Sequence, residues 1–162
     1  MPAPAPDVVL TAEQIASFHE QGYLSIPRIT SLAEVEELRT SLMRLFEQRA
    51  GWREGAQFDL VASGDDDDSA LTQILQPVNY APELRDTQFR ANAAAIARQL
   101  LGDEASASFE HSILKGAREG APTPWHQDEA YRRADAFEYE QISIWMPLQD
   151  ASAEQGCLQY IP

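Results

Sequence analysis

Apolar positions in the N-terminal half of the chain recur mostly with the spacing of an α-helix. Residues 10–22 predict a first helix. Thr11 and Gln14 are spaced as a capping box, and Gly22 suits the left-handed residue that ends a helix. Residues 23–26 follow as a short predicted strand, because apolar and aromatic side chains precede a proline there.

Two longer segments continue the helical pattern. Residues 32–50 carry apolar side chains at helical spacing, and Ser31 with Glu34 is spaced as a second capping box. Residues 82–101 are also helical in pattern, with a break expected near Phe89. Helices are therefore expected to dominate the first half of the chain.

The second half changes from helical spacing to short apolar runs and alternation, which is typical of strands. The predicted strands are residues 70–78, 107–113, 142–148 and 157–161. Residues 51–69 and 116–124 are predicted loops, because glycine, proline and charged residues collect there. Helices followed by strands in one chain indicate an α+β fold.

Composition and charge narrow the class of protein. The chain has 162 residues and a formal net charge of −14, which suits a single domain and argues against nucleic-acid binding. No apolar run approaches the ~20 residues of a membrane span, and the MPAPAP start is unlike a secretory signal. One cysteine, Cys157, excludes an internal disulfide and favours a cytoplasmic location. We expect a loose tail over residues 1–9, one domain over residues 10–162, and no membrane or protein partner.

The segment with the clearest chemistry is Pro124-Trp125-His126-Gln127-Asp128. If its backbone is extended, His126 and Asp128 point to the same face and Gln127 to the other. An imidazole and a carboxylate are two of the three ligands of the facial triad that holds non-haem Fe(II). A bare H-x-D pair is also compatible with an ordinary histidine paired to a nearby carboxylate, so this alternative stays open at the level of the motif.

A wider set of motifs resembles the phytanoyl-CoA dioxygenase family of Fe(II)- and 2-oxoglutarate-dependent oxygenases. The motifs that carry the resemblance are Leu114-Lys115-Gly116, Pro124 to Asp128, Ile144-Trp145-Met146-Pro147-Leu148, and Gly156 to Pro162. They occur in the family's order and extend over nearly the whole chain. The resemblance implies a double-stranded β-helix, also called a jelly roll and similar to the cupins, with the N-terminal helices packed outside.

The resemblance also implies roles for individual residues. His126 and Asp128 match the metal ligands of the family, and a carboxylate at position 128 favours hydroxylation over halogenation. The positions that match contacts to 2-oxoglutarate are Gln73, His111, Gln127 and Trp145. The implied enzyme uses Fe(II), 2-oxoglutarate and O2 to hydroxylate a small organic substrate.

One part of the family pattern has no counterpart in the 162 residues. The third ligand of the family is a histidine just beyond the segment matched by Gly156 to Pro162, and the closing strands of the jelly roll follow it. We therefore expect the N-terminal portion of an oxygenase domain that is inactive as this chain. His111 is a weaker candidate for the third ligand. The alternatives are a cupin-like metal-binding protein without 2-oxoglutarate chemistry and an inert fragment.

Overall fold

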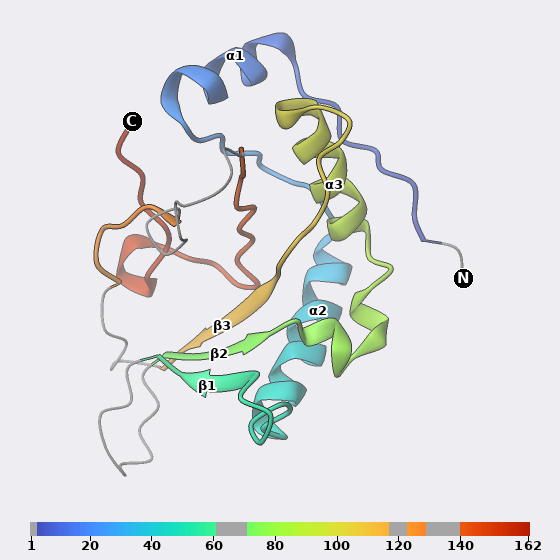
Figure 1. Ribbon diagram of the computed structural model, residues 1–162, viewed down its shortest axis with the longest axis vertical. Coiled ribbons are helices and arrows are strands. Elements are labelled where there is room, and N and C mark those ends of the chain that lie inside the picture. The colour runs from blue at the N-terminus through green and yellow to red at the C-terminus, as the bar shows by residue number, and fades with distance from the viewer. Residues whose placement is uncertain (1–2, 61–70, 117–122, 129–139) are drawn as a thin grey trace, which may run out of the picture.

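The computed structural model describes residues 3–60, 71–116, 123–128 and 140–162. Within these ranges there are three α-helices and a small antiparallel sheet with the strand order β1-β2-β3; α2 packs against the sheet, whereas α1 lies against α3 (Figure 1). The elements are α1 (Ala12–Gln21), α2 (Leu32–Glu47), β1 (Gln57–Asp59), β2 (Leu71–Leu75), α3 (Gln88–Leu101) and β3 (His111–Lys115). The presence of helices together with a separate antiparallel sheet confirms the predicted α+β class. In the part of the chain described, no helix is both long enough and apolar enough to cross a bilayer.

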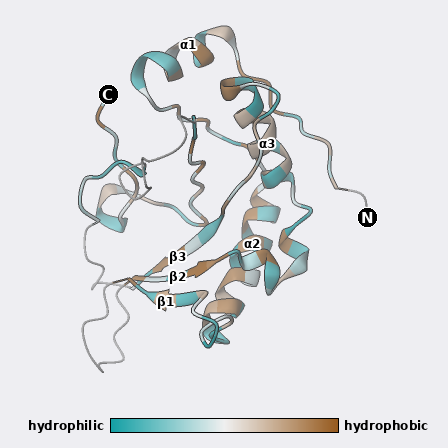
Figure 2. Ribbon diagram, viewed as in Figure 1, coloured by the Kyte–Doolittle hydropathy of each residue, from teal (hydrophilic) through white to brown (hydrophobic). Residues whose placement is uncertain are grey.

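The main core lies between α2 and one face of the sheet. Ile74 of β2 is fully buried there and Leu114 of β3 packs against the same cluster, so alternate residues of these strands point towards α2. Figure 2 shows hydrophobic residues along β2 and on α2. The buried members of the cluster are Leu38, Leu42, Leu45, Phe46, Ile74, Val78, Ala81 and Leu84. On the opposite face of the sheet, the β3 residues His111, Ile113 and Lys115 are exposed, whereas Leu71 and Gln73 of β2 are buried.

Both predicted helix starts are present, but Glu34 acts differently from the expectation. Thr11 and Gln14 form the capping box of α1, as predicted. Ser31 caps α2 by accepting from the Glu34 backbone N–H, whereas the Glu34 carboxylate accepts from the backbone N–H groups of Gln88 and Phe89 at the start of α3. A carboxylate satisfies the unpaired N–H groups of a helix start and is favoured by the helix dipole. Glu34 therefore joins two helices.

The segment expected to be a loose tail is anchored to α3. The Asn92 side chain is 1% exposed, and its Oδ1 accepts from the backbone N–H groups of Asp7 and Val8. Gln99 accepts in the same way from the Leu10 N–H, at 2.8 Å. These contacts join positions more than eighty residues apart in sequence, which local composition does not reveal.

Several predicted strands differ from the structure. β1 lies inside the predicted loop 51–69. Residues 61–69 of that loop, and residues 117–122 of the predicted loop 116–124, lie outside the described residues. No strand is assigned at residues 23–26, 142–148 or 157–161, so those expectations are wrong for the part of the chain that is described. Alternation encodes which face of an extended segment is buried, but a strand also needs a neighbour to pair with.

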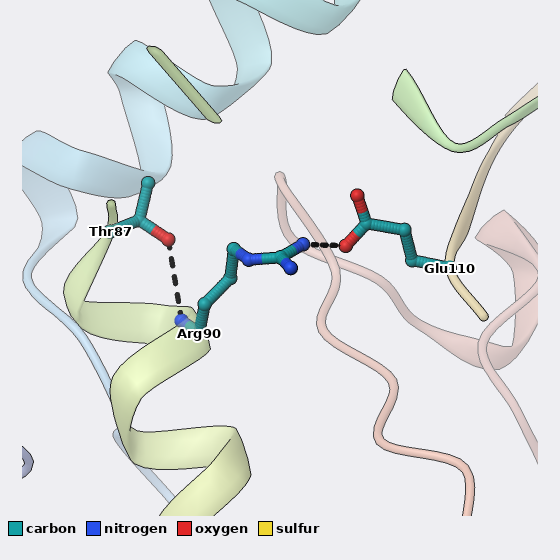
Figure 3. Close-up of polar contacts among 3 residues, drawn as sticks. All are labelled: Thr87, Arg90 and Glu110. Atoms are coloured by element: carbon teal, nitrogen blue, oxygen red, sulfur yellow. Dashed lines mark hydrogen bonds and ion pairs between the residues drawn. The ribbon is translucent and has the colours of Figure 1, made fainter. Parts of the chain in front are cut away.

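The third helix and the third strand are shifted from their predicted bounds. α3 begins at Gln88, after the short 3-10 helix Pro82–Leu84, so the predicted break lies just before the expected position. β3 begins at His111 instead of residue 107. Its start is tied to α3 by an ion pair between Arg90 and Glu110 (Figure 3), which fixes the residue next to His111.

Residues 142–148 keep the predicted alternation although they form no ladder. Ile142 and Ile144 pack against a second cluster, built around Leu10, Ile96 and Leu100. The even-numbered residues of this stretch are partly buried, whereas positions 143, 145 and 147 are exposed. This alternation places Ser143 and Trp145 on the same side of the segment.

Candidate metal centre

His126 and Asp128 meet in the structure, although not on a strand as predicted. The Nε2 atom of His126 lies 3.5 Å from Oδ1 of Asp128. No strand is assigned at residues 123–128, and the two side chains are 36% and 54% exposed. The two groups therefore lie close together without the extended strand expected for them, and their role as metal ligands stays a prediction.

A backbone carbonyl fixes which His126 nitrogen faces Asp128. The Nδ1 atom lies 2.8 Å from the carbonyl oxygen of Pro124. Because a carbonyl only accepts hydrogen bonds, the neutral imidazole carries its proton on Nδ1 and its lone pair on Nε2. This second hydrogen bond is the usual way in which proteins orient a metal-binding histidine.

A serine hydroxyl fixes Asp128 in a comparable way. The Ser143 hydroxyl donates to Oδ2 of Asp128 at 2.6 Å, a distance typical of a hydrogen bond to a charged carboxylate. Oδ1 is the oxygen that faces His126. Figure 1 shows the segment 123–128 (orange) near the C-terminal segment that includes Ser143 (red). In each candidate ligand, the atom that faces away from the other ligand is therefore hydrogen-bonded: Nδ1 of His126 to the Pro124 carbonyl, and Oδ2 of Asp128 to the Ser143 hydroxyl.

The donor set and its spacing fit a divalent transition metal. Nitrogen and oxygen donors bind such ions at about 2.0–2.2 Å, so two donors of one ion lie at most ~4.4 Å apart. The separation of 3.5 Å is within this limit. In the ranges that the structure describes, no group of three His, Cys, Asp or Glu side chains is placed to hold a metal. His111 therefore does not complete a three-residue site with this pair.

Two of the predicted cosubstrate residues lie on the sheet face opposite α2. Gln73 pairs with Ile113, and Leu75 pairs with His111. Directly opposed residues of an antiparallel pair share a face, and residues two apart on one strand do too. Gln73 and His111 therefore lie on one face, away from Ile74 and the core beneath it. Gln73 is 8% exposed, whereas His111 is exposed.

Electrostatics connect this face to Asp128. Partial desolvation of the His111 ring, whose residue is still exposed overall, lowers its pKa, and the Asp128 carboxylate partly opposes that change. Burial raises the pKa of the Tyr160 phenol, and the same carboxylate adds to the increase. Both rings thus lie within the electrostatic range of Asp128. Tyr160 also stacks on Tyr23, with ring centroids 5.1 Å apart and planes 8° from parallel.

The remaining predicted residues are Gln127 and Trp145. Gln127 lies between the two candidate ligands and is exposed. Trp145 is 47% exposed and lies on the same side of its segment as Ser143. Ile113 shares the face of His111 and is 46% exposed, so apolar surface borders the polar groups.

Sequence reasoning missed two residues of this region, Ser143 and Tyr160. The alternation of residues 142–148 could have identified Ser143, because it stands two residues before Trp145 and so shares its side. Tyr160 had no comparable signal. Its approach to Asp128 depends on the course of the chain around the short 3-10 helix Ala153–Gln155.

Comparisons with known proteins agree with the motif pattern. The sequence profile of the phytanoyl-CoA dioxygenase family matches residues 18–162. The crystal structure of EvdO2 from Micromonospora carbonacea var. aurantiaca, in complex with 2-oxoglutarate, superimposes with a TM-score of 0.57 and 33% sequence identity. The match covers 78% of this chain and 51% of EvdO2, so the matched region spans about half the length of that protein. None of the curated proteins matches the chain.

Proposed function

Since this chain belongs to the phytanoyl-CoA dioxygenase family, whose cofactors are Fe(II) and 2-oxoglutarate, we propose that it acts in an oxygenase that hydroxylates a small organic molecule. The observation that carries the proposal is the approach of His126 Nε2 to Asp128 Oδ1, at 3.5 Å. An imidazole and a carboxylate are the donors that a non-haem Fe(II) site requires. The likeness to EvdO2, solved with 2-oxoglutarate bound, supports the same cofactor chemistry.

In this proposal the residues of the chain hold and orient the cofactors. His126 and Asp128 bind Fe(II), with Pro124 and Ser143 holding their outer atoms. We assign contacts to 2-oxoglutarate to Gln73, His111, Gln127 and Trp145. Gln73 and His111 share the sheet face opposite α2, Gln127 lies between the two ligands in sequence, and Trp145 lies on the same side of its segment as Ser143. The bound metal and cosubstrate supply the activation of O2, coupled to oxidative decarboxylation of 2-oxoglutarate.

His111 suits a contact to the cosubstrate in its neutral form. Burial holds its pKa below the ordinary value of 6.5, so the imidazole is mostly uncharged at neutral pH. A neutral imidazole both donates and accepts a hydrogen bond, whereas a charged one only donates. The ring is also held edge-on against Phe109, with centroids 5.5 Å apart. His111 can thus meet either a carboxylate or a keto oxygen without adding charge beside the metal.

The carboxylate at position 128 sets the expected reaction type. A halogenase of this kind needs a small residue there, which leaves a coordination position for halide. Asp128 fills that position with an oxygen donor, so we propose hydroxylation. We also propose that the third ligand and the remaining jelly-roll strands belong to the half of the fold that the match to EvdO2 leaves uncovered.

The test is turnover of 2-oxoglutarate. We expect succinate release that requires Fe(II) and O2 from an extended protein that carries the third ligand. Asp128→Ala should abolish this release. His19→Ala is a matched control, because His19 lies exposed on α1. Wild-type succinate release by Asp128→Ala would refute the assignment. Metal binding without any 2-oxoglutarate turnover would instead favour a cupin-like metal protein.

A further inference from the structure

The Asp128 carboxylate is held asymmetrically. Its Oδ2 accepts a hydrogen bond from the Ser143 hydroxyl at 2.6 Å, while its Oδ1 faces His126 Nε2. Both Asp128 and Ser143 are exposed, so water competes for Oδ2 whenever the hydroxyl is absent. The contact to Ser143 is therefore what distinguishes one carboxylate oxygen from the other.

Ser143 is positioned by its neighbours and not by its own contact alone. Ile142 and Ile144 pack on either side of it against the cluster of Leu10, Ile96 and Leu100. In an extended segment this directs the intervening side chain the other way, towards Asp128. The packing of two isoleucines thus fixes where the hydroxyl stands.

A carboxylate can bind a metal through one oxygen or through both. Two-oxygen binding occupies a further coordination position, and an Fe(II) oxygenase needs its open positions for cosubstrate and O2. A strong hydrogen bond to Oδ2 keeps that oxygen engaged with the protein and leaves Oδ1 as the single donor. Charge-assisted hydrogen bonds of this kind also hold the carboxylate in one rotamer.

We propose that Ser143 is a positioning residue that keeps Asp128 a single-oxygen ligand of the metal. The proposal rests on the proposed function, because it assumes that Asp128 binds Fe(II). It assigns to Ser143 a role in metal affinity and in keeping a position open for 2-oxoglutarate. In this role Ser143 acts through its hydrogen bond to Asp128 and not through a contact of its own with the metal.

The test is Co(II) binding by an extended protein that carries the third ligand, followed by the visible absorption of the bound ion. Ser143→Ala should weaken Co(II) binding by ~10–100-fold, as is typical when the outer partner of a ligand is removed. Ser143→Thr keeps the hydroxyl and should restore most of the affinity and the wild-type spectrum. Ser106→Ala is the matched control, since Ser106 is also exposed but lies in the segment between α3 and β3.

A second readout separates positioning from general stability. Under anaerobic conditions, the charge-transfer absorption of the Fe(II)–2-oxoglutarate chelate should weaken in Ser143→Ala, while the thermal unfolding of the metal-free chain stays unchanged. Wild-type Co(II) affinity and spectrum in Ser143→Ala, combined with loss of binding in Asp128→Ala, would overturn this inference and leave the proposed function standing. Failure of the otherwise unmodified protein to bind Co(II) when the third ligand is supplied would overturn both.

Discussion

Replacing Asn92 tests whether the N-terminal segment is part of the fold. Its side chain is 1% exposed and makes four hydrogen bonds: Oδ1 accepts from the N–H groups of Asp7 and Val8, and Nδ2 donates to Asp7 Oδ1 and the Ile29 carbonyl. Asn92→Ala removes all four and leaves a small cavity. One side chain on α3 thus holds two distant stretches of chain.

The expected cost follows from these bonds. A side-chain hydrogen bond contributes ~0.5–1.5 kcal/mol net, and an unsatisfied buried group costs ~1–3 kcal/mol. The four bonds share one side chain and are partly exposed at Asp7, so they do not add fully. We expect Asn92→Ala to lower the free energy of unfolding by about 3 kcal/mol, equivalent to roughly 6–12 °C in melting temperature for a chain of this length.

Urea denaturation followed by circular dichroism measures this change. Asn92→Asp is the sharper variant, because it keeps the Oδ1 acceptor but sets a carboxylate oxygen against Asp7 Oδ1 and the Ile29 carbonyl. It should be at least as destabilised at neutral pH and recover partly below pH ~4, where carboxylates take up protons. Asn79→Ala, at an exposed asparagine, is the control. If Asn92→Ala lowered the free energy of unfolding by less than ~0.5 kcal/mol, the anchoring role would be refuted.

Three further predictions concern the supports of the site. Glu34→Ala should cost ~2–3 kcal/mol in urea denaturation, because two N–H groups at the start of α3 lose their acceptor, and a cost near zero would contradict that role. Arg90 and Glu110 should show a coupling of about 1 kcal/mol in a double-mutant cycle, whereas strict additivity would argue against the ion pair. In the metal-free chain, partial desolvation lowers the pKa of His111 below 6.5 in the folded state. As the pH falls, the unfolded state therefore takes up a proton at His111 at a higher pH than the folded state does. Stability should therefore fall as pH drops below ~6.5 and level off below the folded pKa, and His111→Gln should remove that part of the fall; an unchanged pH profile would contradict it.

Local signals in the sequence predicted local structure well. The capping residues Thr11 and Ser31 and the left-handed Gly22 begin or end helices as expected, because each acts on backbone groups within one turn. His126 and Asp128, two residues apart, lie close together in the structure, and their role as metal ligands stays a prediction. In each case the information lies within a few residues of the structure it determines.

Longer-range features could not be predicted in this way. Asn92 holding the N-terminal segment and Glu34 capping another helix depend on contacts between distant residues. β1 was missed because its three residues carry no clear alternation and become a strand only by pairing with β2. Residues 142–148 show the reverse case, in which the predicted alternation is present without a ladder. The cytoplasmic location stays a prediction.

Anaerobic calorimetric titration with Fe(II) tests most directly whether His126 and Asp128 bind one metal ion together. With the third ligand supplied, the otherwise unmodified chain should bind a single equivalent of Fe(II), and His126→Ala and Asp128→Ala should each weaken binding by at least ~10-fold. The double variant should bind Fe(II) only slightly more weakly than the weaker-binding single variant, because the loss of either ligand already breaks the shared site. Equal Fe(II) affinity in the unmodified chain and both single variants would contradict the account.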